Sequence, residues 1–140
     1  MENCIFCKII KGEIPATKIY ETEDVFCFLD IKPLNPGHAL LIPKAHYTDL
    51  FDIPEKLLCT LASETKKVAR VVKKVVDADG IGIGQNNGKA AGQVIFHYHI
   101  HIIPRFLVDG YKSWERVKGE IKKETPEKIA EKIKTGLKIN

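Results

Sequence analysis

The sequence contains no run of 18 apolar residues, no charged-then-apolar leader at its N-terminus, no internal repeat and no low-complexity tract. The first two absences argue against a membrane helix and a secretory signal, so we expect a cytoplasmic protein without a membrane partner. The composition is that of a globular protein, with 44% apolar and 29% charged residues. A chain of 140 residues is long enough for one ordinary domain with its own hydrophobic core.

Cysteine content and net charge are both modest. The four cysteines are expected to be thiols or metal ligands in a reducing cytoplasm, rather than a disulfide framework. The net charge of +4 is uneven, because residues 1–104 hold 12 basic and 12 acidic side chains whereas residues 105–140 hold 10 basic and 6 acidic ones. An excess confined to the tail is a weak argument for nucleic-acid binding, and we do not expect a nucleic-acid partner.

The periodicity of apolar residues predicts an α+β fold with several short antiparallel strands, one long helix and smaller peripheral helices. The long helix is predicted over residues 53–77, where Asp52 and Glu55 form a capping box. A short helical turn is predicted before Gly12, and a final helix follows Thr125 as its N-cap. Strands are predicted at residues 17–20, 24–30, 38–42, 81–84 and 97–104.

The most informative stretch is rich in histidine. Three of the five histidines in the chain, His97, His99 and His101, fall within five positions. In a strand this spacing puts the three imidazoles on one face, about 6.5–7 Å apart, with Tyr98 and Ile100 on the other face. A lone histidine is most often a satisfied core or surface residue, but a row of three on one face is hard to explain by packing. The row therefore indicates a functional site.

Two kinds of chemistry suit such a row. A neutral imidazole whose other ring nitrogen is held as a donor can attack phosphorus near pH 7, and a neighbouring histidine can donate a proton to the leaving group. The glycine-flanked loop before the row can add backbone N–H groups and the amides of Asn86 and Gln93. Alternatively, His-x-His on a strand can chelate a metal ion, although three histidines that span about 13 Å cannot share one ion without distortion.

The segment GQVIFHYHIHIIPR (residues 92–105) resembles the signature of the histidine triad family, and IFCKIIKGEIP, FLDIKPLNPGHALLIPKAH and NNGKAAGQ match that family at corresponding places. The resemblance spans residues 3–105. It implies an antiparallel sheet of about five strands with one long helix, a short N-terminal helix and a C-terminal helical tail. We therefore expect one domain at residues 1–105, a helical extension at 106–140 packed on or beside it, and a homodimer that joins two sheets.

The resemblance also implies a purine-nucleotide ligand. His99 would attack the α-phosphorus to give a nucleotidyl-histidine intermediate, His101 would contact the α-phosphate or the leaving group, and His97 would support the site. Asp30 matches the carboxylate that receives the two ribose hydroxyls, which suits an acceptor-only group. Polar residues on the phosphate side match at Asn86 and Gln93. Apolar walls around the base match at Ile5, Phe6, Ile9, Phe28 and Ile31, which without the resemblance would be interpreted as plain core.

Cys4 and Cys7 form a separate Cys-x-x-Cys motif. By itself the motif supplies only two metal ligands. Two semi-buried thiols are the plain alternative, and a redox pair lacks the strand–turn–helix context that such pairs have. It resembles family members in which these cysteines join two histidines, here His46 and His97, in a structural zinc site. A closed site of two cysteines and two histidines is sound zinc chemistry. The nucleotide chemistry that the resemblance implies needs no catalytic metal.

The sequence thus predicts a nucleotide hydrolase or transferase that cleaves a P–N or P–O bond at an α-phosphate. Adenosine phosphoramidates, aminoacyl adenylates and dinucleoside polyphosphates are the expected substrate classes. One position departs from the family pattern, because Val94 stands where many relatives have a hydroxyl residue after the Gly-Gln pair. The alternative is a purine-nucleotide-binding adaptor or regulator that uses the same pocket with little turnover.

Overall fold

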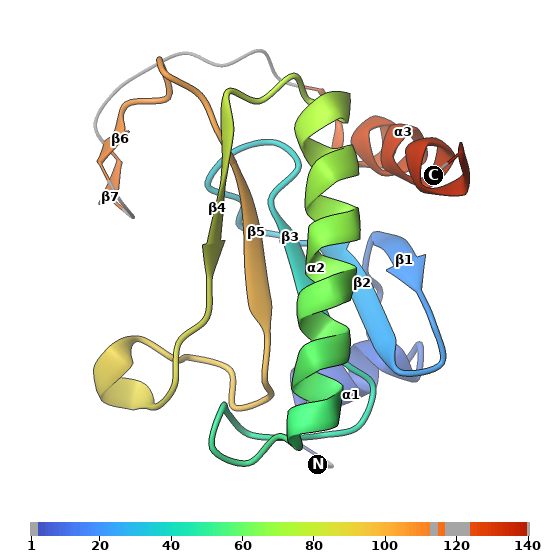
Figure 1. Cartoon of the computed structure of the whole chain (residues 1–140), viewed down its shortest axis with the longest axis vertical. Coiled ribbons are helices and arrows are strands. Elements are labelled where there is room, and N and C mark those ends of the chain that lie inside the picture. The colour runs from blue at the N-terminus through green and yellow to red at the C-terminus, as the bar shows by residue number, and fades with distance from the viewer. Residues whose placement is uncertain (1–2, 113–114, 117–123, 140) are drawn as a thin grey trace.

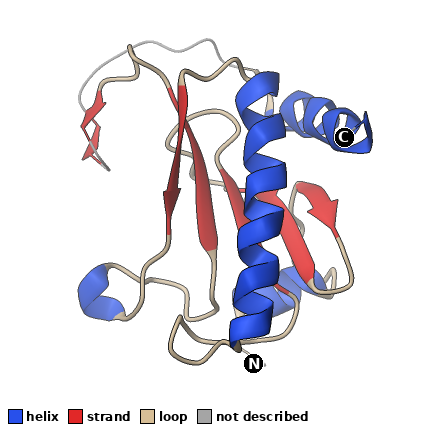
Figure 2. Cartoon of the chain, in the orientation of Figure 1, coloured by secondary structure: helices blue, strands red, loops and turns tan. Residues whose placement is uncertain are grey.

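The computed structural model, which describes residues 3–112, 115–116 and 124–139, is built on one five-stranded antiparallel sheet of strand order β1-β2-β3-β5-β4 (Figure 1). The long helix α2 crosses one face of this sheet, and the short helix α1 lies behind it (Figure 2). The predicted α+β architecture is therefore confirmed. The elements are α1 (Ile5–Ile10), β1 (Lys18–Glu21), β2 (Val25–Leu29), β3 (Ala39–Pro43), α2 (Glu55–Val75), β4 (Gly80–Gly84), a 3₁₀ turn (Lys89–Ala91), β5 (Ile100–Arg105), β6 (Tyr111–Lys112), β7 (Glu115–Arg116) and α3 (Pro126–Ile139).

The central strands β2 and β3 are buried on both faces. All five residues of each strand are buried, and they pair in register from Val25 opposite Pro43 to Leu29 opposite Ala39. The odd-numbered side chains join the core beneath α2, whereas the even-numbered ones join a smaller aromatic and aliphatic cluster with Phe6 of α1. Because side chains alternate along a strand, the sheet separates two cores, and the histidines belong to the side with α1.

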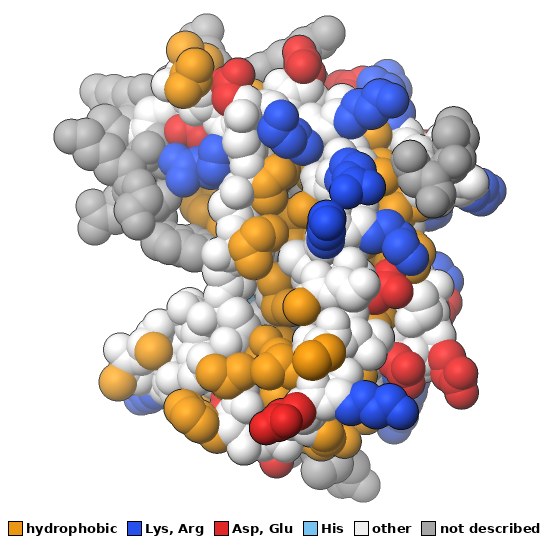
Figure 3. Space-filling model, viewed as in Figure 1, with side chains coloured by type: hydrophobic (Ala, Val, Ile, Leu, Met, Phe, Trp, Pro, Cys, Tyr) orange, Lys and Arg blue, Asp and Glu red, His pale blue; other side chains and the backbone are white. Residues whose placement is uncertain are grey.

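Helix α2 is amphipathic, and its basic residues face solvent. Figure 3 shows the face that α2 covers, where Lys and Arg side chains gather over α2 and the C-terminal helix. The predicted capping box is wrong, because the helix begins at Glu55 with Pro54 as an N-cap that makes no side-chain hydrogen bond. The carboxylate of Asp52 instead accepts the backbone N–H of Thr48 at 2.9 Å, which closes the turn before the helix. No helix in the described part of the chain is long and apolar enough to cross a membrane.

Strand β5 is shorter than predicted, since it begins at Ile100 and leaves His97 and His99 in the segment before it. The reason is that the backbone N–H of Tyr98 donates to the carbonyl of Tyr47 at 2.6 Å, in a loop, rather than to a neighbouring strand. The alternation of side chains nevertheless continues through this segment. Tyr98 and Ile100 are buried in the core beneath α2, so the histidines face the other way.

The C-terminal helix α3 packs against α2 and β1. Ile129, Ala130 and Ile133 are at most 2% exposed and belong to the main core. Thr125 caps this helix as predicted, because its hydroxyl accepts the backbone N–H of Lys128 at 3.4 Å. Between β5 and α3 the described residues form a two-stranded hairpin, β6–β7, instead of further helix.

Candidate active site and metal centre

The structure brings the three predicted histidines together with a fourth. The ring centroids of His99 and His101 lie 5.1 Å apart, and those of His38 and His101 lie 5.2 Å apart. Phe6 stands edge-on to His99 at 5.3 Å and to His97 at 5.8 Å. The result is a continuous row of imidazoles along the sheet face that α1 partly covers.

The hydrogen bonding of His99 leaves one ring nitrogen bare. Its Nδ1 lies 2.7 Å from the backbone carbonyl oxygen of His97. A carbonyl oxygen can only accept, so Nδ1 carries the proton and Nε2 presents a lone pair. The side chain is 7% exposed, and burial lowers the pKa of His99 below its ordinary value. A neutral, oriented imidazole of this kind is a competent nucleophile.

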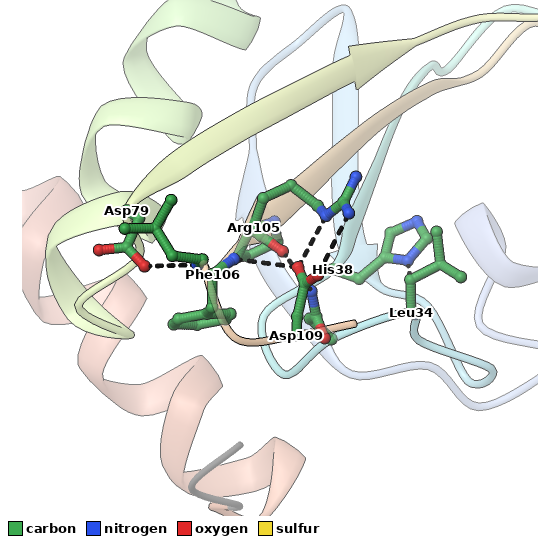
Figure 4. Close-up of polar contacts among 9 residues, drawn as sticks. Leu34, His38, Asp79, Arg105, Phe106 and Asp109 are labelled. Atoms are coloured by element: carbon green, nitrogen blue, oxygen red, sulfur yellow. Dashed lines mark hydrogen bonds and ion pairs between the residues drawn. The ribbon is translucent and has the colours of Figure 1, made fainter. Parts of the chain in front are cut away.

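His101 has the opposite tautomer, and His38 sets it. The backbone N–H of Leu34 donates to Nδ1 of His38 at 3.0 Å (Figure 4), so the proton of the neutral His38 ring is on Nε2. That Nε2–H lies 2.9 Å from Nδ1 of His101, which must accept, and His101 therefore carries its own proton on Nε2. Burial, followed by electrostatic repulsion from the neighbouring rings of His99 and His38 when they are protonated, lowers the pKa of His101 to about 4. The site thus holds a bare Nε2 on His99 beside an Nε2–H on His101.

Sequence reasoning missed His38 as a site residue. It is 3% exposed, at the start of the apolar strand β3, and burial lowers its pKa despite the opposing effect of Asp30. The one available signal was that a histidine stands directly before an otherwise apolar, buried strand, where a polar side chain needs a hydrogen-bond partner. Periodicity places His38 in the sheet, but it does not show that this side chain meets His101, which is 63 residues away along the chain.

Asp30 lies at the His38 end of the row. Its Oδ1 accepts the backbone N–H of Lys32 at 2.9 Å, and its Oδ2 lies 3.6 Å from Nε2 of His38. Ligand-type atoms of Asp30, His38 and His101 are all within 4.8 Å of one another. The bond from Leu34 to Nδ1 of His38 nevertheless puts a proton on the nitrogen that would have to bind the ion. The arrangement therefore suits a hydrogen-bonded chain better than a metal site.

A second cluster contains the four predicted metal ligands. Nε2 of His97 lies 2.8 Å from the carbonyl oxygen of Pro43, so it carries the proton and leaves Nδ1 bare. This Nδ1 lies 3.4 Å from Sγ of Cys4 and 3.6 Å from Sγ of Cys7, and Nδ1 of His46 lies 3.4 Å from Sγ of Cys7. Cys4 is the N-cap of α1, so the first helical turn brings the two sulfurs together.

These four residues fit a tetrahedral zinc ion. With Zn–S bonds of about 2.3 Å and Zn–N bonds of 2.0–2.1 Å, the edges of such a tetrahedron measure roughly 3.4–3.8 Å. The three sulfur–nitrogen distances fall in or near this range, and all four ligand atoms lie within 4.8 Å of one another. The hydrogen bond from His97 to a carbonyl supplies the outer contact that orients a metal-binding imidazole.

The predicted apolar residues divide into two groups. Phe6 and Phe28 are buried and meet edge-on with ring centroids 5.5 Å apart, and Ile9 packs against the same cluster. Ile5 is 46% exposed and Ile31, beside Asp30, is 86% exposed. The two aromatic rings are therefore buried next to the histidines, whereas the side chains of Ile5 and Ile31 are exposed and accessible to a ligand.

The polar loop that precedes the histidines is held by Gln93. Its Nε2 donates to the carbonyls of Thr48 at 2.7 Å and Ile95 at 3.1 Å, and its Oε1 accepts the backbone N–H of Gly88 at 2.8 Å. The amide of Gln93 is thus engaged within the loop. The side-chain amide of Asn86, by contrast, makes no hydrogen bond within the described part of the chain, so it remains available to a ligand.

Comparison with known proteins agrees with this geometry. A family model described as "HIT domain" matches residues 11–108. The chain is 48% identical over 132 residues to an uncharacterised HIT-like protein of Methanocaldococcus jannaschii, covering 94% of this chain and 98% of that one. It is 47% identical over 102 residues to an adenosine 5'-monophosphoramidase of Saccharomyces cerevisiae, covering 73% of this chain and 62% of that protein.

Among solved structures, a zinc-bound histidine triad family protein of Mycobacterium smegmatis superposes with a TM-score of 0.83 at 34% identity. The alignment covers 99% of this chain and 95% of that one. The match of the family model over most of the chain, the extent of the identities and the row of alternating histidines lead to one conclusion. This chain belongs to the HIT, or histidine triad, family.

Proposed function

We propose that the protein is a nucleotide hydrolase that cleaves a P–N or P–O bond at an α-phosphate through a nucleotidyl-histidine intermediate. The observation that carries this proposal is the pair of opposite tautomers, with a bare Nε2 on His99 and an Nε2–H on His101 in ring contact. A nucleophile beside a proton donor is what displacement at phosphorus requires. The relationship to a named adenosine 5'-monophosphoramidase supports adenosine phosphoramidates as one substrate class.

The reaction proceeds in two balanced steps. Nε2 of His99 forms a bond to the α-phosphorus while the bond to the leaving nitrogen or oxygen breaks; the Nε2–H of His101 donates a hydrogen bond to the leaving atom, which takes a proton from a water molecule and leaves hydroxide. In the second step that hydroxide attacks the phosphorus and the bond to His99 breaks, so that Nε2 of His99 is bare again. The products are the free leaving group and a nucleoside monophosphate.

The remaining predicted residues bind the nucleotide in this proposal. Asp30 accepts from the ribose hydroxyls, and Asn86 contacts the phosphate, while Gln93 holds the loop whose backbone N–H groups face the phosphate. Phe6, Phe28 and the apolar residues near them bind the base. Aminoacyl adenylates and dinucleoside polyphosphates are further substrate classes.

Cys4, Cys7, His46 and His97 would hold a structural zinc ion in this proposal, which fixes α1 against the segment before β5. Zinc stabilises the folded chain here and takes no part in bond cleavage. A homodimer and a location in the cytoplasm complete the proposal. Light scattering at micromolar concentration would give twice 15.8 kDa for the homodimer and 15.8 kDa for a monomer.

The experiment is intact-protein mass spectrometry on early-quenched mixtures with an adenosine phosphoramidate, for the wild type and His99→Ala. The wild type is expected to carry an adenylate adduct and release AMP, whereas His99→Ala does neither yet binds AMP within a few-fold of the wild-type affinity. Release of AMP by both proteins would show that His99 is not the nucleophile. Absence of adduct and AMP with normal nucleotide binding would instead support the adaptor function, which the apolar Val94 in place of a hydroxyl favours.

A further inference from the structure

The turn after β5 contains a buried carboxylate. Asp109 is 3% exposed, and it directly follows the residues that the family model matches. Its Oδ2 accepts from Nε of Arg105 at 2.8 Å and from the backbone N–H of Phe106 at 3.0 Å, while its Oδ1 accepts from Nη2 of Arg105 at 3.2 Å (Figure 4). Two parallel bonds from one guanidinium fix the orientation of a carboxylate. The carboxylate of Asp109 is therefore a rigid acceptor at the end of β5.

Asn35 connects this turn to the loop between β2 and β3, which comprises residues 30–38. Its Nδ2 donates to Oδ2 of Asp109 at 3.0 Å and to the carbonyl of Pro104 at 2.8 Å. Asn35 is 2% exposed, and its own Oδ1 is buried without a hydrogen-bond partner in the described part of the chain. An unpaired buried oxygen costs stability, so the contribution of an asparagine at this position lies in the two bonds from Nδ2.

The loop lies close against the body of the domain. Gly37 has a φ angle of +91°, and a Cβ atom there would lie only 2.9 Å from Cγ1 of Val76 and 3.3 Å from Cγ of Pro104. A side chain at this position would therefore push the loop away from β5 and from the end of α2. The close approach at Gly37 and the two bonds of Asn35 together fix the loop against Pro104.

The same loop determines the surroundings of the His38 imidazole. The carbonyl of Asn35 accepts the backbone N–H of His38 at 3.1 Å, and the next residue in the loop, Leu34, donates its backbone N–H to Nδ1 of His38 at 3.0 Å. Both contacts come from residues at or beside the point where Nδ2 of Asn35 holds the loop. A displacement of Asn35 would therefore displace the donor that faces Nδ1 of His38.

Two arrangements of the protons on His38 and His101 are chemically possible. While the N–H of Leu34 faces Nδ1 of His38, the proton of His38 is on Nε2 and His101 presents an Nε2–H. If that N–H moves away, Nδ1 of His38 can carry the proton, and Nε2 of His38 can accept from an Nδ1–H of His101. Nε2 of His101 would then be bare and could not donate a hydrogen bond to the leaving atom. Only the first arrangement supports the proposed reaction.

We infer that Asn35 and Asp109 are positioning residues for the loop that contacts His38. They hold the backbone N–H of Leu34 against His38, and His38 in turn holds His101 in the reactive tautomer. Both act on the reaction only through His38. The inference rests on the proposed function, because it concerns the hydrogen-bond donor of the proposed reaction, but the tautomers themselves can be measured without substrate.

The first test is Asn35→Ser, which removes both Nδ2 bonds while Asp109 keeps its bonds to Arg105 and Phe106. The ring ¹⁵N shifts and couplings of His38 and His101 identify the protonated nitrogens at pH 7.5, where burial keeps both imidazoles neutral. Loss of one hydrogen bond of ordinary strength changes a tautomer ratio by up to about tenfold. We expect mixed tautomers on both rings and a kcat about tenfold lower, with KM within about twofold of the wild-type value.

Asp109→Asn is a milder change in the same network. Its amide oxygen can replace Oδ2, but its NH₂ group then faces the Nη2 donor of Arg105, and the charge-assisted bonds are lost. The expected decrease in kcat is about threefold. Asp79→Asn is the matched control, because Asp79 accepts the backbone N–H of Leu107 at 2.8 Å in the same turn, yet its side chain makes no hydrogen bond to Asn35 or His38 within the described residues (Figure 4). It should leave kcat and both tautomers unchanged.

A double-mutant cycle distinguishes positioning from general support of the fold. In a His38→Ala background, Asn35→Ser should lower kcat by less than about twofold, because the residue through which Asn35 acts is gone. The same tenfold loss with and without His38 would overturn the inference. If Asn35→Ser does not fold, Asp109→Asn takes its place in the cycle.

The remaining outcomes separate this inference from the proposed function. Wild-type tautomers and kcat in Asn35→Ser, or equal losses in Asp109→Asn and Asp79→Asn, would overturn the positioning role. Mixed tautomers with an undiminished kcat would show that the reaction does not depend on the tautomer of His101. Failure of the wild type to release AMP would overturn the proposed function alone, since the ¹⁵N measurement on the substrate-free protein still decides whether Asn35 sets the tautomers.

Discussion

The replacement of Ile133 by alanine tests whether the C-terminal helix belongs to the folding unit of the domain. The family model ends at residue 108, yet Ile133 is 0% exposed and lies in the main core beneath α2. Its neighbours there include Val71 and Val72 of α2 in the same cluster. Removal of its side chain therefore leaves a space that the two helices enclose.

The expected loss follows from the groups removed. Ile→Ala deletes three carbon groups, and at about 0.8 kcal/mol each their burial contributes roughly 2.4 kcal/mol. The cavity left behind adds on the order of 1 kcal/mol, and the better helix propensity of alanine returns a few tenths. The free energy of unfolding should fall by about 3 kcal/mol. For a chain of 140 residues this corresponds to a decrease in Tm of about 10 °C.

The assay is urea unfolding followed by far-UV circular dichroism at one fixed protein concentration. A single transition with an unchanged m-value and a lower midpoint is expected for Ile133→Ala. Lys128→Ala is the control, because Lys128 is exposed on the same helix and should change the free energy by less than about 0.5 kcal/mol. A loss below about 1 kcal/mol, or a separate early transition for α3, would refute the conclusion that α3 is part of the main core.

Further predictions concern the metal and the pH dependence. Cys7→Ser should lower the zinc content from one ion per chain to a small fraction, measured by elemental mass spectrometry after dialysis. Cys59→Ser, on the exposed surface of α2, is the control and should retain the ion. Equal zinc contents in the two variants would contradict the four-residue site. Burial lowers the pKa of His101 from 6.5 to about 4, so between these values the unfolded chain binds a proton that the folded chain does not. The contribution of His101 to stability should thus be complete above pH 6.5 and decrease by up to about 3 kcal/mol as the pH falls to 4. Urea midpoints at pH 7.5, 6 and 4.5 measure it, and an identical slope in His101→Gln would assign the dependence to other groups.

Much of the site could be predicted because its residues are close in the sequence. The two-residue spacing of the triad puts three imidazoles on one side of the chain, even though the hydrogen-bonded strand begins only at Ile100. The Cys-x-x-Cys spacing brings two sulfurs together in one helical turn, as Cys4 at the N-cap of α1 shows. In both cases the local geometry of the backbone is sufficient to place the side chains.

The fold class was also predictable, because the alternation of apolar residues and the length of α2 are properties of single elements. The residues at which individual helices and strands begin were less predictable. The interpretation of Asp52 as a helix cap failed because its carboxylate accepts the backbone N–H of Thr48 in the preceding turn. A short polar side chain can accept either from a nearby turn N–H or from an N–H in the first turn of a helix, and the sequence does not show which.

The order of residues thus determined which chemical groups this protein has and which of them lie side by side along one strand or one helical turn. Neighbours in the chain set the tautomers of His99 and His38, through the carbonyl of His97 and the N–H of Leu34. Only the tertiary structure decided which nitrogen of His97 and of His101 carries the proton, because that choice depends on Pro43 and His38, which are 54 and 63 residues away in the chain. A hydrogen bond across that distance exists only once the sheet has assembled, because the sheet and not the local backbone brings donor and acceptor within 3 Å.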